Sequence, residues 1–544
     1  MSSQSTFVRG AAILAAAGVV VRLMGAALRI ILASPALLGD KGIGLYQMAY
    51  PIFSTLLTIS TAGIPVAISK LIAENLALSN YKEAFRVFRI SLAILILTGA
   101  VITAVLLGGA DFIAGVIIQQ PRAYYSLVAI SPAIFFVTVM SAFRGFFQGR
   151  QQMLPTAISQ LAEQLGRVAA SIFLVISLLP RGLELAAAGA SFGAVVGSVL
   201  GLAVLLAIYL WDRPQFQRQV SLKAPFKTAG FNEIISQIVK LAVPVTLGSL
   251  IMQLFTLIDL AIVPRQLQVA GFTEGRATAL YGQLTGMASS VIYFPNVVVI
   301  ALGVSLVPAI SEALARGNRS LITSRTSIAV KITVLFSLPA AVGLYILATP
   351  ITVLLFTFEN VEAAAPLAAL SWSVIALSLY ITSTNIMQGL GYPSIPVLNM
   401  VCGGVVKSAL CWILTANPSW NVIGAAVASL IGLTVAAILN LYYLARFTGW
   451  RFKVPELVVW PGISVTVMAA VAHIVYRGLL WLGALCFTPG LANGLAVLGA
   501  IVMAVITYGL ALLLSGGLNR DDLNLIPKLG APLIKLAERY HLLR

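Results

Sequence analysis

Charged residues are scarce in this sequence. They make up 9% of its 544 residues, whereas 60% are hydrophobic, and the mean hydropathy is +1.00. A soluble domain typically carries about 25% charged residues. A water-soluble fold of this length could not hide so much apolar surface, because part of every chain must remain exposed. The composition therefore excludes an ordinary soluble protein and predicts a chain whose solvent is lipid.

Cysteine and histidine are rarer still. The three cysteines, Cys402, Cys411 and Cys486, lie in apolar runs without ligand spacing, and the two histidines, His473 and His541, are far apart. This pattern argues against both a disulfide framework and a metal site. The motifs of P-loop nucleotidases, zinc peptidases and serine hydrolases are also missing. We therefore expect neither an enzyme nor a bound cofactor.

Apolar runs long enough to cross a bilayer dominate the chain. A spanning helix needs about 20 mostly apolar residues, and charged or Pro/Gly-rich breaks separate fourteen such runs. We therefore predict an all-α membrane protein of about fourteen transmembrane helices. The predicted spans are 9–33, 43–72, 86–109, 122–147, 155–179, 184–211, 236–263, 279–312, 322–347, 361–388, 394–416, 421–446, 457–481 and 490–515.

The basic residues predict the orientation of these spans. With both termini in the cytoplasm, twenty-four of the 34 Lys and Arg residues fall in cytoplasmic segments and six on the opposite side. The remaining four, Arg22, Arg29, Arg167 and Lys407, lie inside spans. Translocation of basic loops is disfavoured, so we predict cytoplasmic N- and C-termini. Acidic lipid headgroups are the expected partner of this charge, and no nucleic-acid partner is expected.

Short motifs recur in the same order at offsets of 235 to 242 residues. Leu45-Tyr46 returns as Leu280-Tyr281, and Gln148-Gly149 returns as Gln388-Gly389. Arg167 is echoed by Lys407. Six spans separate the copies, an even number, so both copies enter the membrane from the same side. We predict two parallel-repeat six-helix lobes plus two C-terminal helices, an arrangement typical of alternating-access transporters.

The repeat divides the chain into five predicted segments. The linker and the tail are basic and amphipathic, and this pattern fits either a helix on the membrane surface or a solvated segment. The segments are an N-terminal lobe at 1–211, an amphipathic cytoplasmic linker at 212–235, a C-terminal lobe at 236–446, helices 13 and 14 at 447–516, and an amphipathic cytoplasmic tail at 517–544.

Cations inside the predicted spans mark a candidate binding site, because each ionisable group at bilayer depth costs roughly 2.5–3.5 kcal/mol. Arg22 and Arg29 are seven residues apart and so share one helix face. They fit either a cavity wall or snorkelling to the interface. Two guanidinium groups on one face suit a diphosphate, which arginine binds in a bidentate manner. As substrate-binding residues we predict Arg22, Arg29, Arg167 and Lys407.

Other polar residues in the spans are candidates for a cavity or a gate. Glu163 lies four residues before Arg167, which fits either an ion pair along one helix or a polar stripe on a cavity wall. Asp259 fits an ion pair with a cation of the other lobe, or a proton or sodium site. Asn and Gln more often join helices than bind ligands. The predicted cavity or gate residues are Glu163, Asp259, Gln253, Asn296 and Asn385.

Four stretches carry a family resemblance. Residues 38–51 (LGDKGIGLYQMAYP), 63–70 (GIPVAISK), 144–149 (RGFFQG) and 155–167 resemble the stage V sporulation protein B group. That group belongs to the multidrug, oligosaccharidyl-lipid and polysaccharide (MOP) flippase superfamily. The resemblance implies two six-helix lobes in a V around a central cavity, in a bacterial inner membrane. Arg22 and Arg29 match the arginine motif of the family's first helix.

The resemblance also implies a function. We expect export of a lipid-linked saccharide to the outer leaflet by alternating access, with the peptidoglycan precursor lipid II as the leading candidate. Energy would come from a coupling ion, the membrane potential or substrate turnover. Membrane lipids and cell-wall synthases are expected partners, and the oligomeric state is not predicted. The alternatives are a flippase for another polysaccharide precursor, a cation-coupled multidrug exporter of the same fold, and a non-transporting membrane scaffold or enzyme.

Overall fold

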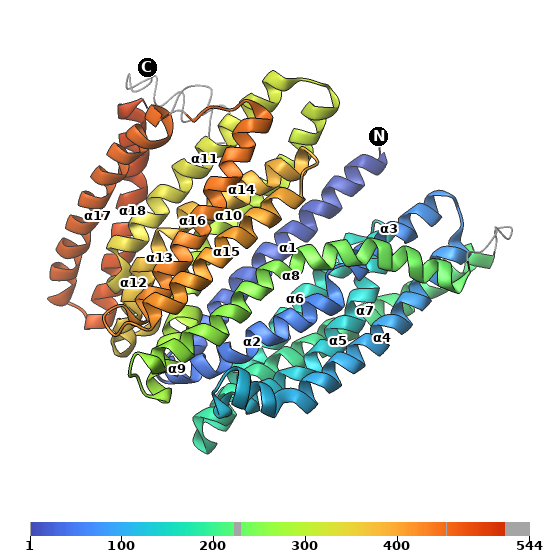
Figure 1. Cartoon of the computed structure of the whole chain (residues 1–544), viewed down its shortest axis with the longest axis horizontal. Coiled ribbons are helices and arrows are strands. Elements are labelled where there is room, and N and C mark those ends of the chain that lie inside the picture. Colours follow the sequence, from blue (N-terminus) through green and yellow to red (C-terminus); the bar gives the residue numbers. More distant parts are fainter. Residues whose placement is uncertain (1, 222–229, 453, 517–544) are drawn as a thin grey trace. The chain divides into compact units, whose positions relative to one another are not determined.

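The computed structural model describes residues 2–221, 230–452 and 454–516, and within these ranges every regular element is a helix (Figure 1). The predicted tail at 517–544 and the middle of the predicted linker, 222–229, lie outside the described residues. A helix satisfies all its backbone hydrogen bonds within one segment, which a bilayer demands of any spanning structure.

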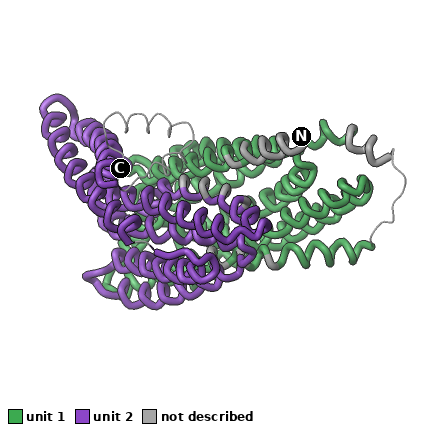
Figure 2. Tube along the Cα trace, turned by 90° about the horizontal axis from the view of Figure 1, so that it is seen from above, with its two compact units in different colours: residues 1–286 green, residues 287–544 purple. Residues whose placement is uncertain are grey.

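The chain forms two compact units, residues Met1–Gly286 and Met287–Arg544 (Figure 2). The helices of the first unit are α1 (Ser2–Leu32), α2 (Gly39–Thr61), α3 (Ile64–Ala77), α4 (Tyr81–Phe112), α5 (Tyr124–Gly149), α6 (Met153–Leu178), α7 (Leu183–Ser221), α8 (Phe231–Val269) and α9 (Glu274–Gly282). Those of the second unit are α10 (Ser289–Ala315), α11 (Arg319–Ile346), α12 (Ala348–Phe356), α13 (Ala364–Ser371), α14 (Ser373–Gly389), α15 (Ser394–Thr415), α16 (Asn421–Thr448), α17 (Trp460–Ala484) and α18 (Pro489–Ser515).

The predicted spans all fall on helical segments, but 43–72, 279–312 and 361–388 each cover more than one helix. In the part of the chain that the structure describes, ten helices are long and apolar enough to cross a membrane, and an eleventh results if the bent pair 358–371 and 373–389 counts as one span. The remaining predicted spans fall on α1, α8 and α10, whose side chains are described only in part. The chain is therefore an all-helical multi-pass membrane protein, and the total of fourteen spans stays a prediction.

The boundary between the two compact units, after Gly286, differs from the predicted boundary between the two lobes. The predicted C-terminal lobe begins at residue 236, in α8, yet Ile234, Ile238 and Ala242 of this helix are buried in the core of the first unit. That core also holds a cluster of aromatic rings from α4, α5 and α7, in which Phe88 and Phe146 have centroids 4.5 Å apart. A repeat and a compact unit are different divisions of a chain, so the predicted boundaries stay a prediction.

The same turn precedes a long helix in each unit. Ser79 before α4 and Gly317 before α11 have left-handed φ angles of 61° and 62°. The next residue is the N-cap in both cases. The Asn80 and Asn318 side chains accept hydrogen bonds from the backbone N–H three residues later, at 3.2 and 3.0 Å. Such caps satisfy one of the free N–H groups at the start of a helix.

Close helix packing also takes the same form in both units. A Cβ atom added to Gly197 of α7 would lie 2.9 Å from Cβ of Arg167 on α6. A Cβ added to Gly432 of α16 would lie 2.6 Å from Cβ of Lys407 on α15. Only glycine allows such close approach of two helix backbones. Each glycine thereby fixes the position of a helix that carries a cation inside the membrane.

Candidate functional site

Two arginines from different helices converge on one tyrosine in the first unit. The guanidinium carbon of Arg29, on α1, lies 5.3 Å from the ring centroid of Tyr50, on α2. The guanidinium carbon of Arg167, on α6, lies 5.4 Å from the same centroid. Both distances are within the range of cation–π attraction. We call Arg29, Tyr50 and Arg167 the arginine–tyrosine cluster.

A second tyrosine supports this cluster. Tyr46 lies one helical turn before Tyr50 on α2, and its side chain is 2% exposed. Its hydroxyl oxygen accepts a hydrogen bond from Nη2 of Arg167, at 3.4 Å. The aromatic ring and the hydroxyl therefore orient the Arg167 guanidinium without neutralising it. Two positive charges held beside one neutral ring create a potential that attracts an anion.

The predicted cations separate into three groups in the structure. Arg29 and Arg167 come together, as members of the arginine–tyrosine cluster. Arg22 lies two turns before Arg29 on α1, and its side chain is exposed. Lys407 is half-buried on α15, in the second unit. Cavity lining and snorkelling both remain open for Arg22, and the substrate-binding roles of all four cations stay predictions.

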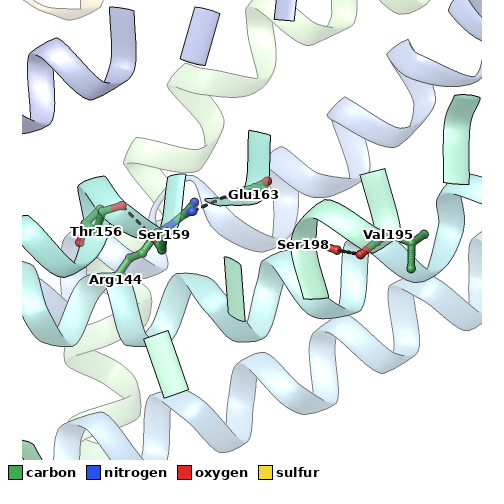
Figure 3. A network of polar contacts seen from close by, with 6 residues as sticks. All are labelled: Arg144, Thr156, Ser159, Glu163, Val195 and Ser198. Atoms are coloured by element: carbon green, nitrogen blue, oxygen red, sulfur yellow. Dashed lines mark hydrogen bonds and ion pairs between the residues drawn. The ribbon is translucent and has the colours of Figure 1, made fainter. Parts of the chain in front are cut away.

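Glu163 pairs with a residue that the spacing of charges did not suggest. Its Oε2 lies 2.8 Å from Nη2 of Arg144, on α5. Nε of Arg144 also donates to the hydroxyl of Ser159 at 3.2 Å, and these contacts form the network shown in Figure 3. The side chains of Arg144 and Glu163 are only 16% and 25% exposed. The partner of Glu163 is thus on a neighbouring helix, whereas Arg167, four residues along α6, contacts the two tyrosines.

Three glutamine side chains form hydrogen bonds between two groups of residues. One group is α2 together with Gln120, and the other is α9 together with the residues that follow it. Nε2 of Gln47 donates to the backbone carbonyl of Thr285, at 3.0 Å. Nε2 of Gln283 donates to Oδ2 of Asp40, at 3.2 Å. Gln120, which precedes a short turn at Pro121–Ala123, donates to the hydroxyl of Thr278. We call these hydrogen bonds the α2–α9 contact.

Two glycines make the α2–α9 contact possible. A Cβ added to Gly282 would lie 2.9 Å from Cα of Gly44, closer than real Cβ contacts come. The two backbones are therefore in direct contact. Gln47 and Gln283, which lie near these glycines, can then form hydrogen bonds with the opposite segment. The neutral bonds of Gln47 and Gln120 each contribute about 0.5–1.5 kcal/mol, and the bond of Gln283 to the Asp40 carboxylate contributes about 1.5–3 kcal/mol. Such a contact is strong enough to hold two helices and weak enough to be released.

The predicted gate residues on α8 also face neighbouring helices of the first unit. Oε1 of Gln253 accepts a hydrogen bond from the hydroxyl of Ser54 on α2, at 3.0 Å. Asp259 is half-buried and interacts electrostatically with Tyr281 on α9. Gln253 thus joins two helices. The predicted pairing of Asp259 with a cation, and the alternative of an ion site, both stay predictions.

The two predicted asparagines lie in the second unit, where they join α10 to α14. Oδ1 of Asn296, a side chain only 1% exposed, accepts a hydrogen bond from the Ser378 hydroxyl at 3.0 Å. The Asn385 amide lies against Gly303, where an added Cβ would come within 2.9 Å of its Cγ. These contacts favour helix joining over ligand binding for both residues.

A neutral hydrogen-bond network lies deep in the second unit. Nδ2 of Asn399 on α15 donates to Oδ1 of Asn440 on α16, at 2.8 Å. Nδ2 of Asn440 donates in turn to the hydroxyls of Ser383 and Thr384 on α14, both at 3.2 Å. The Asn440 side chain is fully buried. Three helices are therefore joined by amides and hydroxyls alone.

Several functional candidates were not identified from the sequence. Tyr46 and Tyr50 are four residues apart, so they share a face of α2, and this spacing was an available signal. Both tyrosines entered the sequence argument only as letters of the resemblance stretch 38–51, and Tyr46 also as part of the repeat. Arg144 gave no signal, because it lies near the end of its predicted span, where arginine is common. Its pairing with Glu163 depends on how α5 and α6 pack.

More than half of the chain matches a known family model. The model described as "Polysaccharide biosynthesis protein" matches residues 7–314. The chain is also similar to Stage V sporulation protein B of Bacillus subtilis, with 28% identity over 539 residues, covering 98% of this chain and 100% of that protein. It is similar as well to the Lipid II flippase MurJ of the same organism, with 24% identity over 462 residues, covering 82% and 83% of the two chains.

Solved structures share the fold. An inward-facing multidrug resistance MATE family transporter of the MOP superfamily aligns with a TM-score of 0.67 and 15% identity, covering 79% of this chain and 98% of that one. The Lipid II flippase MurJ in an inward closed conformation aligns with a TM-score of 0.63 and 16% identity, covering 92% and 97%. At this identity the likeness concerns the fold alone.

Proposed function

The chain belongs to the polysaccharide biosynthesis protein family, within the MOP superfamily of transporters, and from this premise we propose that it is a flippase for a lipid-linked saccharide precursor. It belongs to a transporter family and is not an enzyme. The leading candidate for the substrate is lipid II, because the flippase of that name covers 82% of this chain. The direction of transport would be from the cytoplasmic to the outer leaflet.

The observation that carries this proposal is the arginine–tyrosine cluster. Arg29 and Arg167 present two guanidinium groups beside Tyr50, from α1 and α6. A diphosphate linking a lipid to a saccharide carries several oxygens that arginine binds with paired hydrogen bonds. The pair would hold the diphosphate while the lipid chain stays in the bilayer. Arg22, exposed on α1, would add a third cation on the approach to the cluster.

The α2–α9 contact supports an alternating-access cycle for this flippase. We infer fourteen helices in two six-helix lobes, so that α2 belongs to one lobe and α9 to the other. The hydrogen bonds of Gln47, Gln283 and Gln120 would close one side of the pathway in the described state. Because each bond contributes no more than about 3 kcal/mol, substrate binding could offset its loss. Energy would come from an ion gradient, the membrane potential or substrate turnover.

A multidrug exporter is the second candidate, since a MATE transporter gives a TM-score of 0.67. The charge of the cluster distinguishes the two readings. Many drugs that such exporters would carry are cations, and two arginines beside one ring would repel them. An anionic lipid-linked saccharide, in contrast, suits the same site. The drug-exporter reading therefore requires a binding site away from Arg29 and Arg167.

Complementation tests the proposed function. The wild-type chain would be expressed in bacteria depleted of their own lipid II flippase, next to Arg29→Ala, Arg167→Ala and Arg122→Ala. Arg122 is the matched control, because its side chain is 66% exposed and its partner is Glu184. Survival and the labelling of lipid II at the outer leaflet would be measured at equal membrane levels of each protein.

We expect wild type and Arg122→Ala to restore growth and Arg29→Ala and Arg167→Ala to fail. Loss of one charge-assisted contact to the diphosphate should lower the rate at least about tenfold. Rescue by every variant would contradict the arginine site but keep the function. No rescue by well-expressed wild type would instead exclude lipid II and point to another lipid-linked saccharide or to a drug.

A further inference from the structure

A groove of about 600 Å³ lies in the second unit, between the end of α11, the start of α12, α13 and α17. Small-molecule sites in proteins commonly have volumes of about 300–1,000 Å³. The groove's polar lining consists of Tyr345, Thr349, Glu362 and His473. None of these residues enters the proposed saccharide site, which lies within the first unit.

Short side chains create the space. Ala364, Ala365 and Ala368 of α13 line the groove. Three methyl groups leave a wall that larger residues would fill. Glu362 lies in the short helical turn Phe358–Ala363, which follows α12 and leads into α13. The carboxylate is exposed, so a ligand can reach it.

His473 shows that the groove is polar at membrane depth. It lies on α17, within the candidate span Pro455–Ala484, and its side chain is exposed. An ionisable residue in a span normally faces a protein interior or a wet cavity, because hydrocarbon does not solvate it. The groove supplies Glu362, Thr349 and Tyr345 as polar neighbours for the imidazole.

The groove reaches the interface of the bilayer at Tyr345, at the end of a candidate span. The ring of Tyr345, at the end of α11, contacts the ring of Trp372 with centroids 5.7 Å apart and an interplanar angle of 52°. Both side chains are exposed. Tyr345 stands in the last turn of the candidate span Arg319–Ile346, and an exposed tyrosine at the end of a span is typical of the headgroup level. In the predicted orientation this is the outer leaflet.

We propose that this groove binds the headgroup of a phospholipid with a primary amine, such as phosphatidylethanolamine. The Glu362 carboxylate accepts hydrogen bonds from the ammonium group, and the hydroxyls of Thr349 and Tyr345 and the imidazole of His473 donate to the phosphate. The acyl chains lie along the apolar exterior of α17, where Ile474 is 69% exposed. The inference does not depend on which substrate the chain transports.

The groups in the groove distinguish among phospholipids. Phosphatidylcholine carries a quaternary ammonium, which has no N–H to donate to Glu362. Phosphatidylglycerol lacks the ammonium, and its negative charge meets the carboxylate. Charge-assisted hydrogen bonds are about twice as strong as neutral ones, so the amine lipid should bind preferentially.

Native mass spectrometry of the purified full chain tests the proposal. The protein would be titrated with phosphatidylethanolamine, phosphatidylcholine or phosphatidylglycerol, and the Kd of the first bound lipid would be compared. We expect wild type to bind phosphatidylethanolamine about tenfold more tightly than the other two. Glu362→Gln should abolish this preference. Glu359→Gln is the matched control, because Glu359 is exposed in the same turn but does not line the groove.

A second variant fills the groove without changing its charge. Ala365→Leu places a larger side chain in the wall and should also remove the preference for the amine lipid. If wild type binds the three lipids equally, or if Glu359→Gln acts like Glu362→Gln, the proposal is overturned. It is equally overturned if both Glu362→Gln and Ala365→Leu keep the wild-type preference.

Discussion

The two units share one form of close helix packing, but the side chains around it differ in charge. In the first unit, α6 carries Glu163 and Arg167, and Glu163 pairs with Arg144 on α5. The second unit carries other residues at the positions 240 residues later. Gly403 corresponds to Glu163, Lys407 to Arg167 and Thr384 to Arg144. A glycine of the next helix packs against the cation-bearing helix in both units. Packing thus places the helices, and the side chains decide whether the region is charged or neutral.

The difference has an energetic consequence. A charged pair shielded from water is costly to break, because the remaining charge loses its partner. A neutral amide network within a membrane is worth less, since measured side-chain hydrogen bonds between membrane helices average about 0.6 kcal/mol. The first unit should therefore be more sensitive to single polar substitutions than the second.

The largest effect is expected at the ion pair of the first unit. Arg144→Met leaves the Glu163 carboxylate, 25% exposed, without the Arg144 guanidinium, and should lower the free energy of unfolding by about 3 kcal/mol. Thermal unfolding of the purified protein in detergent measures this loss. The double variant Arg144→Met/Glu163→Gln should recover a large part of it. A single variant as stable as wild type would refute the comparison.

The next effect should be equal in the two units. Gly197→Ala and Gly432→Ala each force a Cβ against the helix that carries Arg167 or Lys407, and overpacking of this kind costs about 1–3 kcal/mol. Gly108→Ala is the control, because an added Cβ there meets no atom within 4 Å. Parallel denaturation curves would measure all three. A loss confined to one unit would contradict the shared packing.

A smaller effect is expected from the neutral network of the second unit. Asn440→Leu removes the acceptor of Asn399 and the donor to Ser383 and Thr384. We expect a loss of about 1–2 kcal/mol, measured by the same thermal unfolding. If Asn440→Leu lowers the free energy of unfolding more than Arg144→Met does, the second unit is the more sensitive to polar substitutions and the comparison is reversed.

The smallest stability effect should come from the α2–α9 contact. Gln47→Leu removes one partly buried hydrogen bond to the backbone carbonyl of Thr285 and should cost about 0.5–1 kcal/mol. Under the proposed function this substitution should change transport more than stability, because it weakens the contact that closes one side of the pathway. Outer-leaflet labelling of the lipid-linked substrate, together with thermal unfolding, would separate these effects. Unchanged transport with a large loss of stability would make the contact a purely structural one.

The sequence by itself determined the class of the molecule and the positions of its helices. Every predicted span falls on helical segments, because lipid does not hydrogen-bond to the backbone and a long apolar run has to satisfy its own N–H and C=O groups. The family also followed from contiguous motifs. The intramembrane cations were visible for the same reason, since a charge within an apolar run stands out in the composition.

Only the tertiary structure decided which of these residues meet. Arg29 joins Arg167 over Tyr50, Glu163 pairs with Arg144, and Gly44 touches Gly282. None of these contacts is implied by spacing along one helix, because each depends on how a helix is rotated about its axis and which neighbour it packs against. Apolar surface in lipid is nearly uniform and sets neither choice. Glycines and a few polar side chains do so, and their partners lie far away in the sequence.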